Sequence, residues 1–125
     1  MTVPSYFIRS KAEPSEYWYC PNSYDNADIF VSRTHRTQFC VRISHEPTNT
    51  KTIMIGSDEI TITRSGANLS VGVRENGLGS LIVGHNPLSG LKFSSFENKF
   101  MAVSYGLSDM KTLIHTEDGE EWELI

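Results

Sequence analysis

The sequence predicts a single all-β domain. Its apolar clusters are short, they alternate with polar residues or are rich in β-branched side chains, and most end at Gly, Pro, Asn, Asp or Ser. Such clusters are typical of strands joined by turns, whereas helix signals are nearly absent. The chain has 125 residues, of which 38% are hydrophobic, so it can build one core but hardly two. These observations together favour a β-barrel or a β-sandwich.

Twelve segments carry the strand pattern. They follow one another at an average spacing of about ten residues, within the roughly 8–12 residues usual for barrels and sandwiches. Each is a short run of apolar or alternating residues next to a turn signal. In chain order the expected strands are residues 6–10, 16–20, 28–32, 38–44, 52–55, 59–64, 68–73, 80–84, 91–96, 100–105, 111–115 and 121–125.

Three stretches of the chain share one design, in which an apolar triplet is followed by a histidine, a turn and an aromatic residue on the next strand. The triplets end at Val31, Val83 and Ile114, and the aromatic residue follows 8, 10 and 8 residues later. The histidines are His35, His85 and His115, and the aromatic residues are Phe39, Phe93 and Trp122. Three matching hairpins indicate an internal repeat.

The starts of the three units repeat as well. Ile8-Arg9-Ser10 resembles Thr63-Arg64-Ser65 and, more loosely, Val103-Ser104-Tyr105. Arg9 and Arg64 are 55 residues apart, while Arg64 and Ser104 are 40 apart, so an insertion of 15 residues at 44–58 would make the two intervals equal. The repeat therefore predicts three units of about 40 residues, each with four strands.

Units of four strands cannot each bury a hydrophobic face alone, but three of them stacked about a pseudo-threefold axis can close a barrel and remove free sheet edges. This arrangement is a β-trefoil, and we expect residues 1–125 to form one such domain. Its inward aromatic residues would be Phe39, Phe93 and Trp122. Its barrel wall would include Ile8, Ile62 and Val103.

Three segments carry a resemblance to a known family. They are the opening Ser5-Tyr6-Phe7-Ile8-Arg9-Ser10-Lys11-Ala12, the run Glu16-Tyr17-Trp18-Tyr19-Cys20 and the closing Glu121-Trp122-Glu123-Leu124-Ile125. With these segments the chain resembles the ricin-B-like β-trefoil lectins, above all their fungal cytoplasmic members, which include mannose-binding lectins and a lectin-like subunit of tyrosinase. The resemblance extends over the whole chain and implies a protein that binds a glycan or monosaccharide, of mannose type, without catalysis and without a cofactor.

The chain departs from this family at one motif. Such lectins usually carry Gln-x-Trp on the last strand of each unit, where this chain has Thr37-Gln38-Phe39, Leu91-Lys92-Phe93 and Glu120-Glu121-Trp122. The aromatic residue is retained, but the glutamine two places before it is not. No sugar-binding residue of the family is therefore carried over. A second interpretation stays open, in which the chain is a lectin-like interaction subunit that docks on a larger enzyme such as a tyrosinase and binds no sugar.

Candidate ligand-binding residues form two groups in the sequence. Sugar recognition needs a flat apolar face and convergent planar polar groups. The loop 21–28 supplies such residue types, and the following hairpin adds two more, which gives Asn22, Tyr24, Asp25, Asn26, His35 and Arg36. The second group is Glu75-Asn76-Gly77 together with His85 and Asn86. The alternative is that both are polar turns whose Asx side chains bond their own backbone.

Metal binding is not expected at the histidines or the cysteines. His35, His85 and His115 could hold a divalent transition metal if they converged, but a threefold axis would scatter them over the surface. Cys20 and Cys40 lie in no zinc-binding spacing. We expect both to be buried free thiols, with a disulfide as the alternative.

Three adjacent aromatic residues, Tyr17-Trp18-Tyr19, lie on one expected strand. Because successive side chains of a strand point to opposite faces, Trp18 should lie on one face and the two tyrosines on the other. One of these faces should belong to the core, and the other could serve as a stacking platform or a protein contact.

Charge and motifs exclude several classes of function. The net charge is −4 and there is no basic run, which disfavours nucleic-acid binding. No segment has the apolar length of a membrane span, and the amino-terminal residues do not read as a signal peptide, so we expect a cytoplasmic, soluble protein. Motifs of hydrolases, metalloproteases and phosphate-binding loops are missing, which argues against an enzyme. The acidic residues at 117–121 predict a solvated turn rather than a calcium loop or catalytic carboxylates.

The sequence thus predicts a monomeric, cofactor-free β-trefoil that binds a glycan. The first alternative is an interaction subunit of a larger oxidase. The second is a trefoil protease inhibitor that acts through the insertion at 44–58, because this segment interrupts the repeat.

Overall fold

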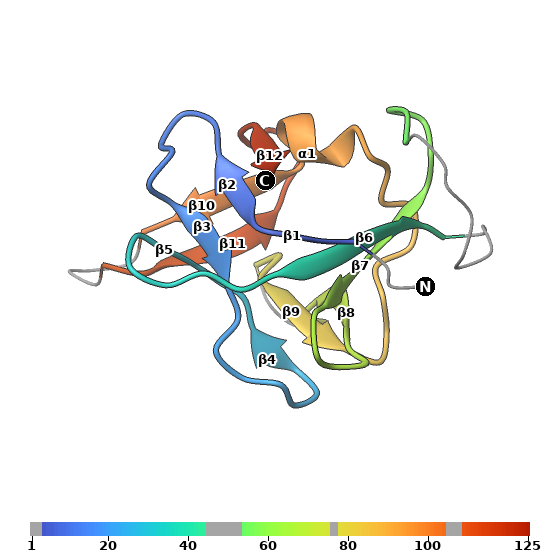
Figure 1. Cartoon of the computed structure of the whole chain (residues 1–125), viewed down its shortest axis with the longest axis horizontal. Coiled ribbons are helices and arrows are strands. Elements are labelled where there is room, and N and C mark those ends of the chain that lie inside the picture. The colour runs from blue at the N-terminus through green and yellow to red at the C-terminus, as the bar shows by residue number, and fades with distance from the viewer. Residues whose placement is uncertain (1–3, 45–53, 76–77, 105–108) are drawn as a thin grey trace.

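The structure, a computed structural model, describes residues 4–44, 54–75, 78–104 and 109–125 (Figure 1). These residues form twelve strands and one helix of four residues, which confirms the predicted all-β class. They contain no helix long and apolar enough to cross a membrane. The strands are β1 (Ser5–Tyr6), β2 (Ile8–Ser10), β3 (Tyr17–Tyr19), β4 (Ala27–Asp28), β5 (Phe30–Ser32), β6 (Phe39–Ile43), β7 (Ile60–Arg64), β8 (Ser70–Val73), β9 (Leu81–Gly84), β10 (Phe100–Val103), β11 (Lys111–His115) and β12 (Trp122–Leu124), and the helix is α1 (Ser95–Asn98).

The strands form two six-stranded sheets. One has the order β1-β6-β7-β8-β9-β4 and the other the order β10-β11-β5-β3-β2-β12. Pairing is antiparallel throughout the described strands. A single bridge between Ser80 and Ile114 joins the end of β9 in one sheet to β11 in the other. Figure 1 shows the strands around a common interior, with α1 beside β12 at one end of the molecule and β4 at the opposite end.

Two predicted strands, 6–10 and 28–32, are each divided in two because the chain passes from one sheet to the other. β1 pairs with β6 and β2 pairs with β12, and the nitrogen and oxygen of Phe7 between them bond the oxygen and nitrogen of Ile125 at 3.1 and 2.9 Å. Likewise β4 pairs with β9 and β5 with β3, while Ile29 between them donates to the carbonyl of Leu81 at 3.1 Å. Each of these two segments therefore contributes one strand to either sheet.

Trp18 lies at the centre of the core. Its side chain is fully buried, and its ring centroid is 5.1 Å from that of Phe100, 5.7 Å from Phe39 and 6.0 Å from Trp122. The rings meet at steep angles, the edge-to-face geometry that aromatic pairs favour. The indole nitrogen of Trp122 donates to the carbonyl of Phe100 at 3.0 Å, whereas that of Trp18 has no partner among the described residues.

The expected alternation of Tyr17, Trp18 and Tyr19 is confirmed. Trp18 points into the core, while both tyrosines are only half-buried on the opposite face of β3. The period-two geometry of a strand accounts for this division. The remaining core is mostly aliphatic, and its fully buried members include the predicted wall residues Ile8 and Ile62, whereas Val103 is half-buried.

The predicted strand 91–96 is wrong, since only a single bridge at Lys92 replaces it. Lys92 makes one bridge to Glu59, but the chain then turns into α1. The hydroxyl of Ser95 accepts a hydrogen bond from the nitrogen of Lys92 at 3.0 Å, and this local bond competes with a strand ladder. Phe93 is consequently half-buried, unlike Phe39 and Trp122, and packs against Phe96 with centroids 6.1 Å apart.

Two predictions fall on the segment before β7. Met54 and Ile55, the described part of the expected strand 52–55, are not in a strand, and residues 52–53 lie outside the described residues. The expected insertion 44–58 also lies mostly outside them, at 45–53.

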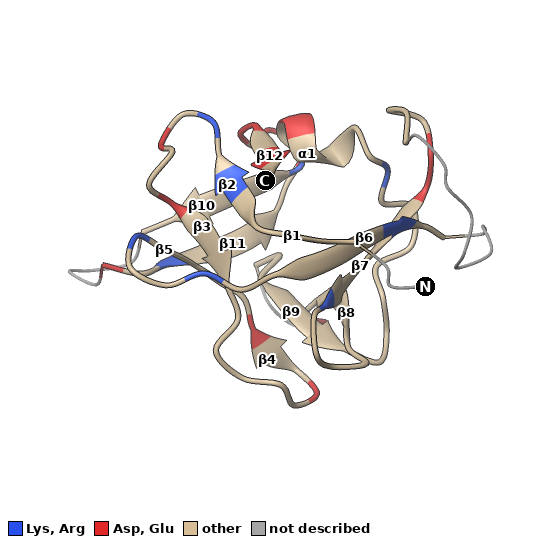
Figure 2. Cartoon of the chain, viewed as in Figure 1, with Lys and Arg blue, Asp and Glu red and all other residues tan. Residues whose placement is uncertain are grey.

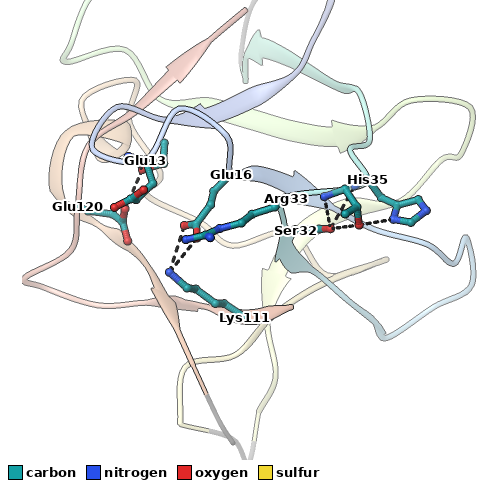
Figure 3. A network of polar contacts seen from close by, with 9 residues as sticks. Glu13, Glu16, Ser32, Arg33, His35, Lys111 and Glu120 are labelled. Atoms are coloured by element: carbon teal, nitrogen blue, oxygen red, sulfur yellow. Dashed lines mark hydrogen bonds and ion pairs between the residues drawn. The ribbon is translucent and has the colours of Figure 1, made fainter. Parts of the chain in front are cut away.

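A buried carboxylate joins three strands at their ends (Figure 3). The side chain of Glu16 is only 3% exposed, and its oxygens lie 3.3 Å from Nε of Arg33 and 2.9 Å from Nζ of Lys111. Glu16 directly precedes β3, Arg33 directly follows β5, and Lys111 begins β11. The two cations compensate a charge that would be costly to bury alone.

Both cysteines are free thiols, as expected. Cys20 is buried, and its burial raises the pKa of its thiol. Cys40 is half-buried rather than buried, with its sulfur 3.4 Å from the hydroxyl of Ser5. The raised pKa keeps Cys20 protonated and unreactive.

Candidate ligand-binding site

A pocket of about 440 Å³ lies beside the β8–β9 hairpin and strand β4. This volume is within the range of roughly 300–1,000 Å³ found for small-molecule sites. The side chains of Val73 and Ile82 supply apolar surface, and the other lining residues supply mainly polar groups. The lining consists of Asp25, Asn26, Val73, Arg74, Glu75, Ile82, Gly84, His85 and Asn86.

The pairing of β4 with β9 brings the two sides of the pocket together. Ala27 lies opposite Val83, and the nitrogen of Asn26 donates to the carbonyl of Val83 at 2.9 Å. Asn26 has a positive φ of 69°, which Asn tolerates better than most residues and which turns the chain into β4. Oδ1 of Asp25 then accepts a hydrogen bond from the nitrogen of His85 at 3.2 Å. A contact between residues 60 apart in the chain thus joins the two sides of the site.

Two glycines of the hairpin allow the loops to approach this closely. A Cβ atom at Gly84 would lie 2.6 Å from Oδ1 of Asp25, and one at Gly72 would lie 2.5 Å from the carbonyl oxygen of Asn86. Real Cβ atoms do not come so close to other atoms, so any larger residue would push Asp25 or Asn86 away. The positions of Asp25 and Asn86 therefore require that residues 84 and 72 have no side chain.

Arg74 closes one side of the pocket and is fixed by two acceptors. A terminal nitrogen of its guanidinium lies 2.5 Å from Oδ1 of Asp28 and 3.3 Å from the carbonyl oxygen of Asn26. Both members of the Arg74–Asp28 pair are partly exposed, so the pair orients Arg74 more than it stabilises the fold.

Four of the eight predicted ligand-binding residues line this pocket. They are Asp25, Asn26, His85 and Asn86, which the sequence assigned to two separate groups and which the structure brings together. Glu75 from the second group also lines it, while Asn76 and Gly77 lie outside the described residues.

The other four predicted residues, Asn22, Tyr24, His35 and Arg36, do not line the pocket. Tyr24 is 61% exposed, and the carbonyl of Asn22 accepts a bond from the thiol of Cys20 at 3.3 Å. The sequence grouped His35 and Arg36 with the loop 21–28, but they are not among the residues that line the pocket with Asp25 and Asn26. They follow β5, whose pairing with β3 directs them towards the outer face of that strand.

That outer face forms a second surface, here called the Arg36 surface, which consists of Phe7, Tyr17, Tyr19, His35 and Arg36. The guanidinium carbon of Arg36 lies 4.4 Å from the ring centroid of Phe7 and 5.0 Å from that of Tyr17, within cation–π range. The His35 ring stacks on Tyr19 at 5.1 Å and its Nδ1 lies 2.9 Å from the Thr34 hydroxyl. The aromatic rings are therefore partly covered by their own neighbours.

The three repeated histidines lie in three different environments. His35 is on the Arg36 surface, His85 lines the pocket, and His115 is half-buried with its ring 5.9 Å from that of Phe100. Burial lowers the pKa of His115. Among the described residues no three His, Cys, Asp or Glu side chains are grouped as a metal site would need.

Three of the four acidic residues at 117–121 pair with neighbouring groups. Glu117 lies 2.6 Å from Nζ of Lys99, which lowers the pKa of Glu117, and Glu121 lies 2.8 Å from Nζ of Lys11. Glu120 accepts bonds from the Ser10 hydroxyl at 3.1 Å and from a backbone nitrogen at 3.2 Å. These carboxylates serve as partners of nearby strands.

Arg74, Val73 and Ile82 are pocket residues that sequence reasoning missed. The two aliphatic residues belong to predicted strands. Both strands are buried without regular alternation, so the sequence does not show which face each side chain occupies. Arg74 follows β8 directly, and an exposed arginine after a strand carries no signal of a partner 46 residues earlier.

Comparison of the chain with protein-family models, with curated proteins and with solved structures finds no significant match.

Proposed function

We propose that the chain is a non-catalytic, carbohydrate-binding β-trefoil whose ligand site is the pocket beside the β8–β9 hairpin. The observation that carries the proposal is the convergence of planar polar side chains on one cavity with two aliphatic residues in its lining. Carboxylates and carboxamides bind the paired hydroxyls of a sugar ring, and aliphatic side chains contact its C–H groups.

The strand connections support the trefoil part of the proposal. Strands β2, β7 and β10 would each begin a unit, and in two cases the first strand pairs with the last strand of the preceding unit, β7 with β6 and β2 with β12. Within the first two units the next two strands pair in sequence, β2-β3-β5 and β7-β8-β9. A barrel of three similar units would show this pattern three times, and it is seen for two of the three junctions.

Binding at this pocket should be weak. Its lining contains no Phe, Tyr or Trp, and most of its polar residues are exposed, so a sugar would gain little from stacking or desolvation. A dissociation constant on the order of 1 mM is expected for a monosaccharide.

The test is a titration of the isotope-labelled protein with mannose, galactose and glucose, followed by amide chemical shifts in NMR spectra. We expect shifts at Asp25, Asn26, His85 and Asn86 that saturate together. Asp25→Ala should abolish them, and Arg36→Ala, a change on the other surface, should leave them intact. If no sugar shifts these amides at concentrations several times the expected dissociation constant, the pocket does not bind carbohydrate and the proposal fails.

A second candidate function, docking on a larger enzyme such as an oxidase, is favoured by the Arg36 surface. Arginine and tyrosine side chains are among those that most often dominate protein–protein interfaces, and this surface presents an exposed arginine beside two half-buried tyrosines. Arg36 makes no ion pair with the described residues, so its charge is available to a partner's carboxylate. Co-purification of an oxidase with the native protein, lost in Arg36→Glu and retained in Asp25→Ala, would select this function. Retention by the Arg36 variant would exclude this surface.

A further inference from the structure

The pocket holds more negative charge than its single cation can balance. Asp25 and Glu75 line it, and neither makes an ion pair among the described residues. One oxygen of Asp25 accepts a hydrogen bond from the His85 amide, and its second oxygen bonds none of the described residues. Glu75 is exposed at the pocket rim. Both carboxylates are therefore open to a ligand.

Arg74 does not offset these charges, because its own charge is already matched. Its guanidinium is 2.5 Å from Asp28, which follows Asn26 by two residues. Three carboxylates, those of Asp25, Glu75 and Asp28, thus stand against one guanidinium in and beside the pocket, an excess of two negative charges. Figure 2 shows the acidic segments on β4 and on the turn beside it, at the end of the molecule opposite α1.

We propose that this pocket selects cationic amino sugars over neutral sugars and excludes acidic sugars. The proposal rests on the function proposed above and adds the chemical class of its ligand. An ammonium group donates three hydrogen bonds, and its positive charge attracts the unpaired carboxylates of Asp25 and Glu75. The carboxylate of a uronic acid is repelled by the same two groups.

The open geometry limits the size of the effect. The carboxylates are solvent-exposed, so each contact should resemble a surface ion pair rather than a buried one. An amino sugar should bind about fivefold more tightly than its neutral parent, the ratio that an exposed pair of roughly 1 kcal/mol gives. At 1 M salt, where the Debye length is about 3 Å, the ratio should approach one.

Matched ligands test the proposal with the amide shifts of His85 and Asn86 as the readout. Glucose, galactose and mannose are each compared with their 2-amino derivative near neutral pH, and glucose also with glucuronate. Tighter binding of each amino sugar that has a binding parent, weaker binding of glucuronate than of glucose, and loss of these differences in high salt would support charge selection. Equal binding of neutral and amino sugars would overturn it while the proposed function stands. Failure of every sugar to bind would overturn both.

Two variants locate the effect in the pocket. Glu75→Gln replaces one of the two open carboxylates by an amide of nearly the same shape and should lower the ratio of amino to neutral sugar clearly below fivefold. Glu97→Gln removes the same charge from an exposed position on α1 and should keep the fivefold ratio. If both variants lose the ratio equally, the net charge of the protein is responsible and the assignment to the pocket is wrong.

Discussion

Replacing Glu16 should destabilise the protein less than removing both of the cations that pair with it. The three side chains differ in exposure, since that of Glu16 is 3% exposed, that of Lys111 is 30% and that of Arg33 is 59%. In Glu16→Gln the two cations lose their partner but can turn to water, and a glutamine fills nearly the same space. In the double variant Arg33→Met and Lys111→Met, by contrast, a carboxylate stays buried without either compensating charge.

The expected free energies of unfolding follow from this asymmetry. Glu16→Gln loses charge-assisted hydrogen bonds to half-exposed donors, for which about 1–2 kcal/mol is appropriate. The double variant leaves an uncompensated buried charge, for which losses of about 3–5 kcal/mol are typical. Methionine keeps most of each aliphatic stem in place, so lost packing contributes little to the difference.

Urea unfolding followed by tryptophan fluorescence measures both losses, and the slope with urea must stay constant for the comparison to hold. Because Trp18 and Trp122 are both in the core, the signal reports the same packed region in every variant. If Glu16→Gln costs as much as the double variant or more, desolvation of the carboxylate does not govern this cluster, and the reasoning is refuted.

Three further changes have defined outcomes. Gly84→Ala should displace the Asp25 carboxylate and weaken sugar binding by about tenfold or more in the NMR titration, as expected for loss of a charged hydrogen bond; unchanged affinity would show that this carboxylate does not contact the ligand. Trp122→Phe should lower the unfolding free energy by about 1 kcal/mol more than Trp18→Phe, because only the Trp122 indole donates a hydrogen bond; equal losses in urea unfolding would contradict this. Burial lowers the pKa of His115, so the unfolded chain takes up a proton at this residue at higher pH than the folded protein does. Neutral His115 therefore makes its full contribution to the unfolding free energy above the ordinary pKa of 6.5, and this contribution is lost as the pH falls below that value. His115→Gln should therefore reduce the fall in unfolding free energy on acidification, and an unaltered pH profile would count against this origin.

A strand could be predicted from the sequence where the two-residue alternation of side chains determined which face was buried. Tyr17, Trp18 and Tyr19 alternate as the sequence indicates, because a strand with one face in the core leaves no other choice. The end of the predicted strand 91–96 was not predictable from hydrophobicity. There a single hydroxyl, that of Ser95, bonds the backbone three residues earlier and favours a helical turn over a strand.

The sequence predicted the types of residue at the site but not which residues line the same pocket. Loop composition identified Asp25, Asn26, His85 and Asn86, because Asn and Asp in turns offer exposed planar groups. That these residues share one pocket follows from the pairing of β4 with β9, a contact between distant segments that no local pattern reveals. The same pairing decides that Arg74 belongs to the site.

The pairing of β2 with β12 has a consequence for how the chain folds. Arg9 and Glu123, whose charged groups are 2.7 Å apart, are 114 residues apart in sequence. The β8–β9 hairpin can form locally. The pairing of β2 with β12 forms only after most of the backbone has been ordered, because closing so long a loop is entropically unfavourable. Refolding should accordingly take milliseconds to seconds, as for other proteins rich in distant strand pairs, and stopped-flow fluorescence would reveal whether it does.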